Sequence, residues 1–290
     1  MRSYIPHYQL VTPATLADAI ALLGNEPGVW KPFAGGTDLM VLLEAGKLPH
    51  LNYLNITQLR ELQGIEATDE WLTIGALTTY TDIQNNGVLQ EEFPMLCQAA
   101  SETGGLAIQN RGTLGGNIIN ASPAADSPPA LLAYDAQIEL TSINGSRWID
   151  YSSFHIGYKQ MMIAREELLT RIRTPRPSRP QIHYYRKVGT RKAQAISKVC
   201  LAATATVVAR QIKTVRIAFG SVAPIPLRCF KTESVIRGAA VDNNVVAAAK
   251  AELAREMSPI DDIRSTKQYR LSVSQNLLAD FLASISQRGE

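Results

Sequence analysis

Two pairs of adjacent glycines carry the clearest chemical signal in this sequence. Gly35 and Gly36 lie in the segment Ala-Gly-Gly-Thr of residues 34–37, and Gly115 and Gly116 lie in Thr-Leu-Gly-Gly-Asn of residues 113–117. Glycine adopts backbone conformations that other residues avoid, and neighbouring backbone N–H groups that no side chain shields can converge on an anion. We expect these segments, the first and second glycine loops, to bind phosphate, with ordinary tight turns as the alternative for each.

The surroundings of the loops suit a dinucleotide. The first loop follows a strand-like segment and leads into a predicted helix, whose N-terminal end attracts anions, and Thr37 adds a hydroxyl donor. Two such loops could approach one diphosphate from both sides. Neither matches the spacing GxGxxG or GxxxxGKS/T, which disfavours a Rossmann or P-loop site.

Charged residues beyond the loops leave several interpretations open. Asp126 could accept hydrogen bonds from a ribose or a ring N–H, but the residues alone favour a helix cap. Residues 165–198 hold ten Arg or Lys against two Glu. This basic stretch could be a solvated linker and strand edge, or a docking surface for an acidic partner. Nucleic acid is disfavoured because no array of aromatic residues accompanies the charge.

The residues that metal sites and nucleophilic catalysis require are not arranged for either. Cys97, Cys200 and Cys229 are far apart and form no CxxC pair, so this chain predicts no zinc site and no iron–sulfur cluster of its own. The four histidines form no metal-binding pair at helical spacing. We therefore predict no metal ligand and no catalytic residue in this chain.

The elements that must position the loops can be read from periodicity. In the first half we expect helices at residues 16–23, 37–46, 79–85, 93–101 and 130–133, and strands at 29–33, 51–56, 71–76 and 167–173. Asn144-Gly145 joins residues 136–142 and 147–149 in a predicted hairpin. Residues 107–126 are expected to be a structured loop, since they show almost no periodicity.

The proline-rich residues 174–180 predict a linker between two domains, 1–176 and 177–290. After it we expect strands at 182–188, 199–209 and 214–220 and helices at 245–254 and 271–286. The fold class is therefore α+β, ending in a three-stranded antiparallel sheet with helices.

Composition sets the broad class of the protein. Hydrophobic residues make up 46% and charged residues 19% of 290, as in folded soluble proteins, and the net charge is only +3. No apolar run is long enough to span a bilayer, and residues 1–6 lack the apolar core of a secretory signal. The expected location is the cytoplasm.

Three segments together resemble a known family. They are residues 34–38 (AGGTD), residues 111–129 (RGTLGGNIINASPAADSPP) and residues 185–192 (YRKVGTRK). In this order they resemble the FAD-binding medium subunit of molybdenum hydroxylases, the family of xanthine dehydrogenase and carbon monoxide dehydrogenase. The resemblance covers nearly the whole chain, and its second segment is long and specific.

The resemblance implies both a fold and a role. The fold is an FAD-binding domain of the vanillyl-alcohol-oxidase (PCMH) type, made of two α/β subdomains, followed by the C-terminal sheet-and-helix domain. The implied partners are a large subunit with a molybdenum cofactor and a small subunit with 2Fe–2S clusters, as a dimer of heterotrimers. Electrons would reach FAD from those clusters and leave to NAD, oxygen or another acceptor.

Cofactor-binding residues follow from the resemblance position by position. They are Lys31, Pro32, Phe33, Ala34, Gly35, Gly36, Thr37 and Asp38 on one side and Thr113, Leu114, Gly115, Gly116 and Asn117 on the other, with Ile119, Asp126, Leu168 and Lys187 around the flavin. Neither loop contains His or Cys, so FAD is expected to be non-covalent. The competing hypothesis is a self-sufficient flavin oxidase or reductase with its own organic substrate.

Overall fold

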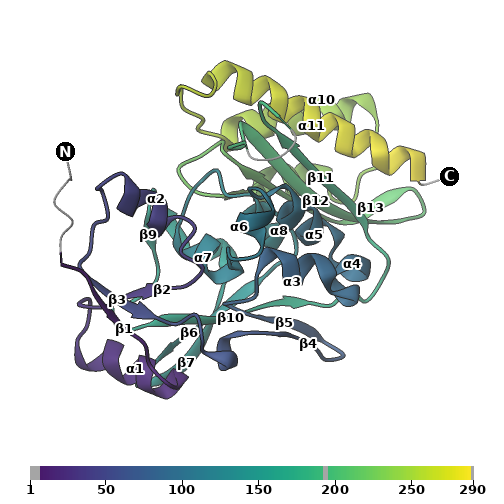
Figure 1. The fold of residues 1–290 in the computed structure, drawn as a ribbon. Helices are drawn as coiled ribbons and strands as arrows, with labels where there is room; N and C mark the ends of the chain where they lie inside the picture. Colours follow the sequence, from purple (N-terminus) through teal and green to yellow (C-terminus); the bar gives the residue numbers. More distant parts are fainter. Residues whose placement is uncertain (1–6, 192–194, 289–290) are drawn as a thin grey trace.

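The N-terminal part of the chain forms a small parallel sheet of three strands, and in the sequence a helix separates each strand from the next. The computed structural model describes residues 7–191 and 195–288, so Lys192 of the third family segment lies outside the described residues. Strands β1 (Gln9–Val11), β2 (Lys31–Phe33) and β3 (Asn52–Asn55) pair in the order β1-β3-β2. Helix α1 (Leu16–Asn25) precedes β2, and α2 (Leu39–Glu44) follows it (Figure 1).

Local sequence explains where α1 begins. The Thr15 hydroxyl accepts a hydrogen bond from the Asp18 N–H, and the Asp18 carboxylate accepts one from the Thr15 N–H. This reciprocal pair satisfies donors that the first turn of a helix leaves unpaired. The buried face of α1, at Ala19, Ile20 and Leu23, then packs into its own core cluster. The predicted helix is confirmed and is two residues longer than expected.

A second sheet of five antiparallel strands forms the base of the next α/β unit. Its order is β4 (Ile65–Ala67), β5 (Trp71–Gly75), β10 (Leu168–Pro175), β6 (Gln137–Ser142), β7 (Gly145–Asp150). One face buries aliphatic side chains such as Leu72, Ile138 and Ile172 in the main core. On the other face the Arg173 guanidinium lies 4.1 Å from the ring centroids of both Trp71 and Trp148. A charged residue is thus accommodated by aromatic stacking.

Short helices cover the buried face of this sheet. They are α3 (Tyr80–Asn85), α4 (Gly87–Glu92), α5 (Pro94–Glu102), α6 (Leu106–Gln109), α7 (Leu114–Ile119) and α8 (Ser127–Ala133). The prediction of a loop over residues 107–126 is wrong in part, because α7 lies within it and α6 overlaps its start. Both helices have six residues or fewer, and α7 contains two adjacent glycines, so neither gives a clear 3.6-residue pattern.

The hairpin of β8 (His155–Gly157) and β9 (Gln160–Met161) was not predicted from the sequence. His155 is buried, and its Nε2 lies 3.1 Å from the Ile118 carbonyl oxygen of α7. The hairpin is therefore held against the helix that follows the second glycine loop.

The C-terminal part is an antiparallel sheet with helices. Strands β11 (Ile182–Val188), β12 (Val199–Val208), β13 (Gln211–Gly220) and β14 (Leu227–Arg228) pair in sequence order. Helices α9 (Phe230–Ile236), α10 (Asn243–Glu256) and α11 (Lys267–Arg288) complete it. Three strands were expected and four are present. The fourth, β14, was not predicted because it follows Pro226 and is only two residues long, which is too short for a periodic signal.

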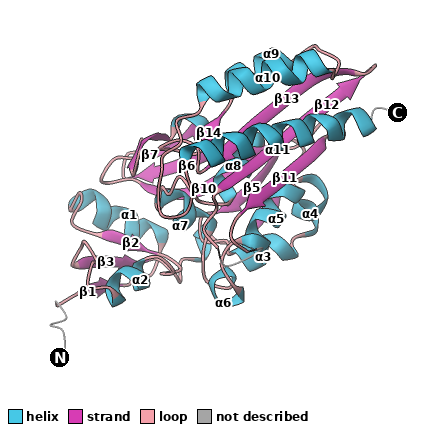
Figure 2. Cartoon of the chain, turned by 90° about the horizontal axis from the view of Figure 1, so that it is seen from above, coloured by secondary structure: helices cyan, strands magenta, loops and turns pink. Residues whose placement is uncertain are grey.

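Alternation along β12 explains why helices lie on both sides of this sheet. Val199, Leu201 and Ala203 face the core beneath α10 and α11, whereas Cys200 and Ala202 join the main core with α8. Figures 1 and 2 show α11 along one face of the sheet and α8 on the other side. The residues facing α8 are small, so helix and sheet approach closely.

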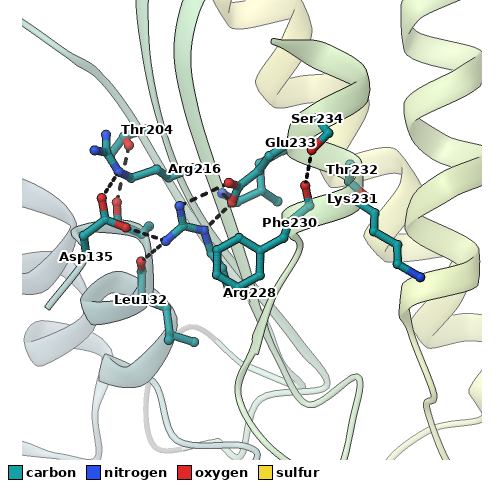
Figure 3. Close-up of polar contacts among 12 residues, drawn as sticks. Leu132, Asp135, Thr204, Arg216, Arg228, Phe230, Lys231, Thr232, Glu233 and Ser234 are labelled. Atoms are coloured by element: carbon teal, nitrogen blue, oxygen red, sulfur yellow. Dashed lines mark hydrogen bonds and ion pairs between the residues drawn. The ribbon is translucent and has the colours of Figure 1, made fainter. Parts of the chain in front are cut away.

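Polar side chains also join the two parts. Arg228 of β14 donates to the Glu233 carboxylate, to the Leu132 carbonyl and to Asp135 after α8, with an Arg228 Nη1 to Asp135 Oδ1 distance of 2.8 Å (Figure 3). Arg216 of β13 pairs with the same aspartate. The predicted linker is shorter than expected, since Thr174 and Pro175 still pair with β5.

No helix within residues 7–191 and 195–288 has both the length and the apolar character needed to cross a membrane.

Candidate functional site

The two glycine loops meet at one cavity. Its volume is about 500 Å³, which lies within the range of small-molecule and cofactor sites. Most of the predicted cofactor-binding residues line it: Lys31, Pro32, Ala34, Gly35, Gly36, Thr37, Asp38, Thr113, Gly116, Asn117 and Ile119. We call it the glycine cavity. Segments about 80 positions apart in the sequence therefore form a single site.

The structure places the remaining predicted residues behind the cavity wall. The Phe33 ring packs against Gly36, Leu114 is fully buried in the core, and Gly115 lies against Ala76. Leu168 belongs to the core cluster on which Ala34 packs. These residues support the loops from behind, and Asp126 and Lys187 form a separate pair described below.

Glycine is required in the first loop by close backbone contact. A Cβ atom added at Gly35 would lie 1.8 Å from the carbonyl oxygen of Arg111, which is shorter than any non-bonded contact. Gly36 has a φ of +75°, in the left-handed region that favours glycine. Any side chain at position 35 would therefore push the first loop away from the segment leading into the second.

The first loop offers backbone donors that nothing in the described chain uses. The N–H groups of Gly35, Gly36, Thr37 and Asp38 make no hydrogen bond to the described residues. A row of free N–H groups beside a cavity is suited to an anion, since such groups need an acceptor. This supports the anion-binding interpretation over an ordinary turn.

The second loop is built differently. Four of its five N–H groups already have acceptors: Leu114 donates to Thr78 O (3.0 Å), Gly115 to Ala76 O (2.9 Å), Gly116 to Thr113 Oγ1 (3.1 Å) and Asn117 to Thr113 O (3.0 Å). The expected pair of open backbone nests is therefore replaced by one open loop and one helix start. What the second loop presents to the cavity is side chains, including Asn117, whose buried Oδ1 has no partner among the described residues.

Four residues with polar side chains also line the cavity without having been predicted: His50, Tyr80, Asn120 and Lys159. Asn120 lies in the family segment that follows the second loop, so its position was a usable signal. The other three come from separate elements with no local motif. The Asn120 Nδ2 donates to Asp38 Oδ1 at 3.0 Å, and its Oδ1 accepts from the Lys159 ammonium at 2.9 Å.

Burial lowers the pKa of two basic groups in this wall. It lowers the pKa of His50 below its ordinary value of 6.5, and the nearby positive charge of Lys31 lowers it further. Burial also lowers the pKa of Lys159, an effect that the negative charge of Asp38 opposes.

Asp126 and Lys187 form a buried ion pair outside the cavity lining. The Lys187 Nζ lies 2.7 Å from Asp126 Oδ2 and 2.8 Å from the Glu102 carbonyl oxygen. Burial raises the pKa of Asp126 to about 6, although Lys187 lowers it. The second carboxylate oxygen of Asp126 has no partner among the described residues. Asp126 stands at the N-cap position of α8, as the residues alone favoured, but its side chain makes no cap hydrogen bond.

The basic stretch does not form one charged surface. Within it, Arg171 pairs with Glu139, Arg173 stacks between two tryptophans, Arg176 pairs with Glu92, Lys187 pairs with Asp126, and Lys198 lies over Tyr269. Five of its ten basic residues are therefore paired or stacked within the chain. No group of His, Cys, Asp or Glu in the part of the chain that the structure describes could hold a metal ion.

The observed groups fit the diphosphate of a dinucleotide. The glycine cavity combines free backbone donors, two lysines and a hydroxyl, and the close contact at Gly35 leaves no room for a side chain. Phosphate groups are bound in proteins by such donors and charges.

Comparison with known proteins identifies FAD as the dinucleotide. Residues 6–177 match the family model described as FAD binding domain in molybdopterin dehydrogenase. Residues 183–285 match the model described as CO dehydrogenase flavoprotein C-terminal domain. A relative named xanthine dehydrogenase FAD-binding subunit, from Escherichia coli O157:H7, is 34% identical over 268 residues and 91% of each chain. The glyceraldehyde dehydrogenase medium chain of Sulfolobus acidocaldarius is 29% identical over 93% of this chain and 95% of its own.

Solved structures agree with the sequence relatives. A carbon monoxide dehydrogenase from Hydrogenophaga pseudoflava, which lacks the Mo-pyranopterin moiety of its molybdenum cofactor, contains a chain that superposes with a TM-score of 0.93 at 25% identity, covering 98% of this chain and 99% of that one. The family matches span most of the sequence, and they confirm the resemblance seen in its motifs. The chain therefore belongs to the FAD-binding subunits of the molybdopterin dehydrogenases, a family of oxidoreductase subunits.

Proposed function

We propose that this chain is the FAD-binding electron-transfer subunit of a molybdenum hydroxylase complex. Electrons would come from 2Fe–2S clusters of a partner subunit and pass to an external acceptor such as NAD or oxygen. The observation that carries the proposal is the convergence of both glycine loops on one cavity whose first loop has unused N–H donors. Relatives named as FAD-binding subunits or medium chains of dehydrogenases support it.

Bound FAD supplies the redox chemistry, and the protein supplies binding and orientation. Gly35, Gly36, Thr37 and Asp38 donate backbone N–H groups to the diphosphate, and Lys31 adds positive charge. In the second loop, Thr113 and Asn117 contribute side chains to the cavity lining. Gly116 has no side chain, so its backbone lines the cavity directly. Ile119 and Leu168 are proposed to lie near the flavin, and Asp126 and Lys187 to contact it, as the family resemblance implies.

FAD is proposed to be held without a covalent bond. Cys200 and Cys229 are fully buried in the cores, and Cys97 packs against the main core. His50 does line the cavity, so release of flavin on denaturation is the direct test. All of the flavin should enter the supernatant after acid precipitation, and retention in the pellet would contradict this part of the proposal.

The proposed partners are a large molybdenum-cofactor subunit and a small 2Fe–2S subunit, in a dimer of heterotrimers. We further propose two domains, residues 1–176 and 177–290. The core between the C-terminal sheet and α10 and α11 consists only of residues from the second domain, which supports this division.

Purification of the native complex tests the proposal. We expect two further polypeptides to co-purify, with flavin and iron–sulfur bands in the visible spectrum. The isolated chain should carry flavin that no organic substrate bleaches without those partners. Substrate-dependent bleaching by the chain alone would instead establish the alternative, a self-sufficient flavin oxidase or reductase.

A further inference from the structure

The tip of the β8–β9 hairpin places a lysine in the wall of the glycine cavity. Lys159 lines this cavity together with residues of both glycine loops. Its ammonium group donates to the side-chain oxygen and to the backbone carbonyl of Asn120, and Asn120 in turn donates to Asp38. A continuous chain of hydrogen bonds therefore joins the hairpin, the end of α7 and the first loop.

The hydrogen-bonding capacity of this ammonium group is not exhausted. A protonated lysine has three N–H donors and no acceptor. Asn120 accepts two hydrogen bonds from Lys159, which leaves one donor beside the cavity. Asn120 thus orients the ammonium group and leaves one of its N–H donors available to a ligand.

The charges that line the cavity indicate which kind of ligand the remaining N–H donor of Lys159 would bind. Each phosphate of a dinucleotide carries a negative charge, and the described lining of the cavity holds two lysines, Lys31 and Lys159, and one carboxylate, Asp38. Lys31 lies on β2, next to the first loop, whereas Lys159 comes from the hairpin against α7. Since the N–H groups of Leu114–Asn117 in the second loop already have acceptors, most of the ligand's charge on that side must be met by side chains.

The backbone at this position is unusual. Lys159 has a φ of +57°, in the left-handed region, although it is not glycine. Such a conformation is unfavourable for a residue with a side chain, and it persists only where the surrounding structure holds it. Here the hairpin is anchored through His155 to α7, so the lysine is presented from a fixed base.

We propose that Lys159 is a cofactor-binding residue that donates to the diphosphate of FAD from the tip of the β8–β9 hairpin. The inference rests on the proposed function, and it assigns to the hairpin the cationic contribution that the second loop does not supply. Asn120 acts as its positioning residue.

Equilibrium binding to the FAD-free chain tests this inference, with FAD and ADP as probes because both contain the diphosphate. Lys159→Met removes the charge at similar length, and Lys159→Arg retains it. Lys47→Met is the matched control, because Lys47 is exposed and lies outside the cavity lining. Affinity is measured by flavin fluorescence for FAD and by competition for ADP, at low and high ionic strength.

We expect Lys159→Met to bind both probes about tenfold more weakly, the effect of losing one charge-assisted contact. Its affinity should also depend less on salt than that of the wild-type chain. Lys159→Arg and Lys47→Met should bind close to wild type. If Lys159→Met does not fold, Lys159→Gln compared with Lys159→Arg decides by the same salt dependence.

Wild-type affinity and wild-type salt dependence in the uncharged variants would overturn the role of Lys159. Failure of the wild-type chain itself to bind FAD would overturn the proposed function instead, so the two failures are distinguishable.

Discussion

Gly35 sets the distance between the two glycine loops, because its backbone touches the Arg111 carbonyl group. We predict that Gly35→Ala binds FAD at least about tenfold more weakly, since the new methyl group must separate the loops. Flavin content per protein and the dissociation constant for FAD measure this. Gly87→Ala is the control: a Cβ there meets nothing within 4 Å, and its φ is not positive. Equal loss in both variants would show that steric contact at Gly35 is not the cause.

The buried pair of Asp126 and Lys187 gives a prediction about stability. Lys187→Met leaves a carboxylate of low exposure without its cation, which should cost about 3–5 kcal/mol of unfolding free energy. The double variant Asp126→Asn/Lys187→Met removes both charges of the pair, so it should be more stable than Lys187→Met. Chemical denaturation measures both, and equal stability of the single and double variants would contradict the prediction. FAD retention in Lys187→Met tests its proposed contact with the cofactor.

The same pair also gives a pH dependence. Burial raises the pKa of Asp126 from 3.8 to about 6 in the folded chain, so between these values the folded state binds more protons than the unfolded state. The contribution of Asp126 to stability therefore falls as pH rises through this window. Asp126→Asn should remove that slope from the denaturation midpoint measured against pH, and an unchanged slope would contradict it.

At the scale of elements, the β8–β9 hairpin and α7 depend on one another through His155. Burial lowers the pKa of His155 below 6.5, although its hydrogen bond to the Ile118 carbonyl opposes this. Below pH 6.5 the unfolded chain takes up a proton that the folded chain resists, so the free energy of unfolding falls as pH falls. We predict that His155→Gln shows a weaker fall on acidification than wild type. Thermal unfolding across that pH range provides the measurement, and identical profiles would rule out this role.

The whole molecule is held together by a shared core and by Arg228. Its guanidinium group bridges Glu233 of α9 to Asp135 and Leu132 near α8 (Figure 3). The Glu233 side chain is only 1% exposed, so Arg228→Met should cost about 3–5 kcal/mol. Arg255→Met is the control, because its pairing with Glu252 leaves Arg255 74% exposed, and exposed pairs contribute about 1 kcal/mol or less. Similar losses in the two variants, measured by denaturant unfolding, would contradict the prediction.

The sequence predicted the strands that connect the N-terminal and C-terminal parts of the chain, but not which helices pack on each face of them. The strands expected at 182–188 and 199–209 are present as β11 and β12, and β11 has the predicted bounds. That Cys200 and Ala202 face α8 while Val199 and Leu201 face α11 depends on which helices cover each side. A strand buried on both faces is apolar throughout, so its sequence cannot assign a partner to either face.

The sequence by itself determined the glycine loops, most of the longer elements and the family. These properties are local: conformational freedom at glycine, the Thr15 cap and the alternation in strands each act within a few residues. The specific segment at 111–129 added the identity of the cofactor.

Only the tertiary structure decided which donors remain available. Whether the N–H groups of Gly115 and Gly116 are free depends on Ala76 and Thr113, and the second lysine of the cavity, Lys159, comes from a distant hairpin. A hydrogen bond saturates its donor, so the binding capacity of a loop is fixed by the neighbours that the fold brings to it. The physical reason is that a motif specifies a backbone shape, whereas a binding site is what remains unpaired after the chain has folded.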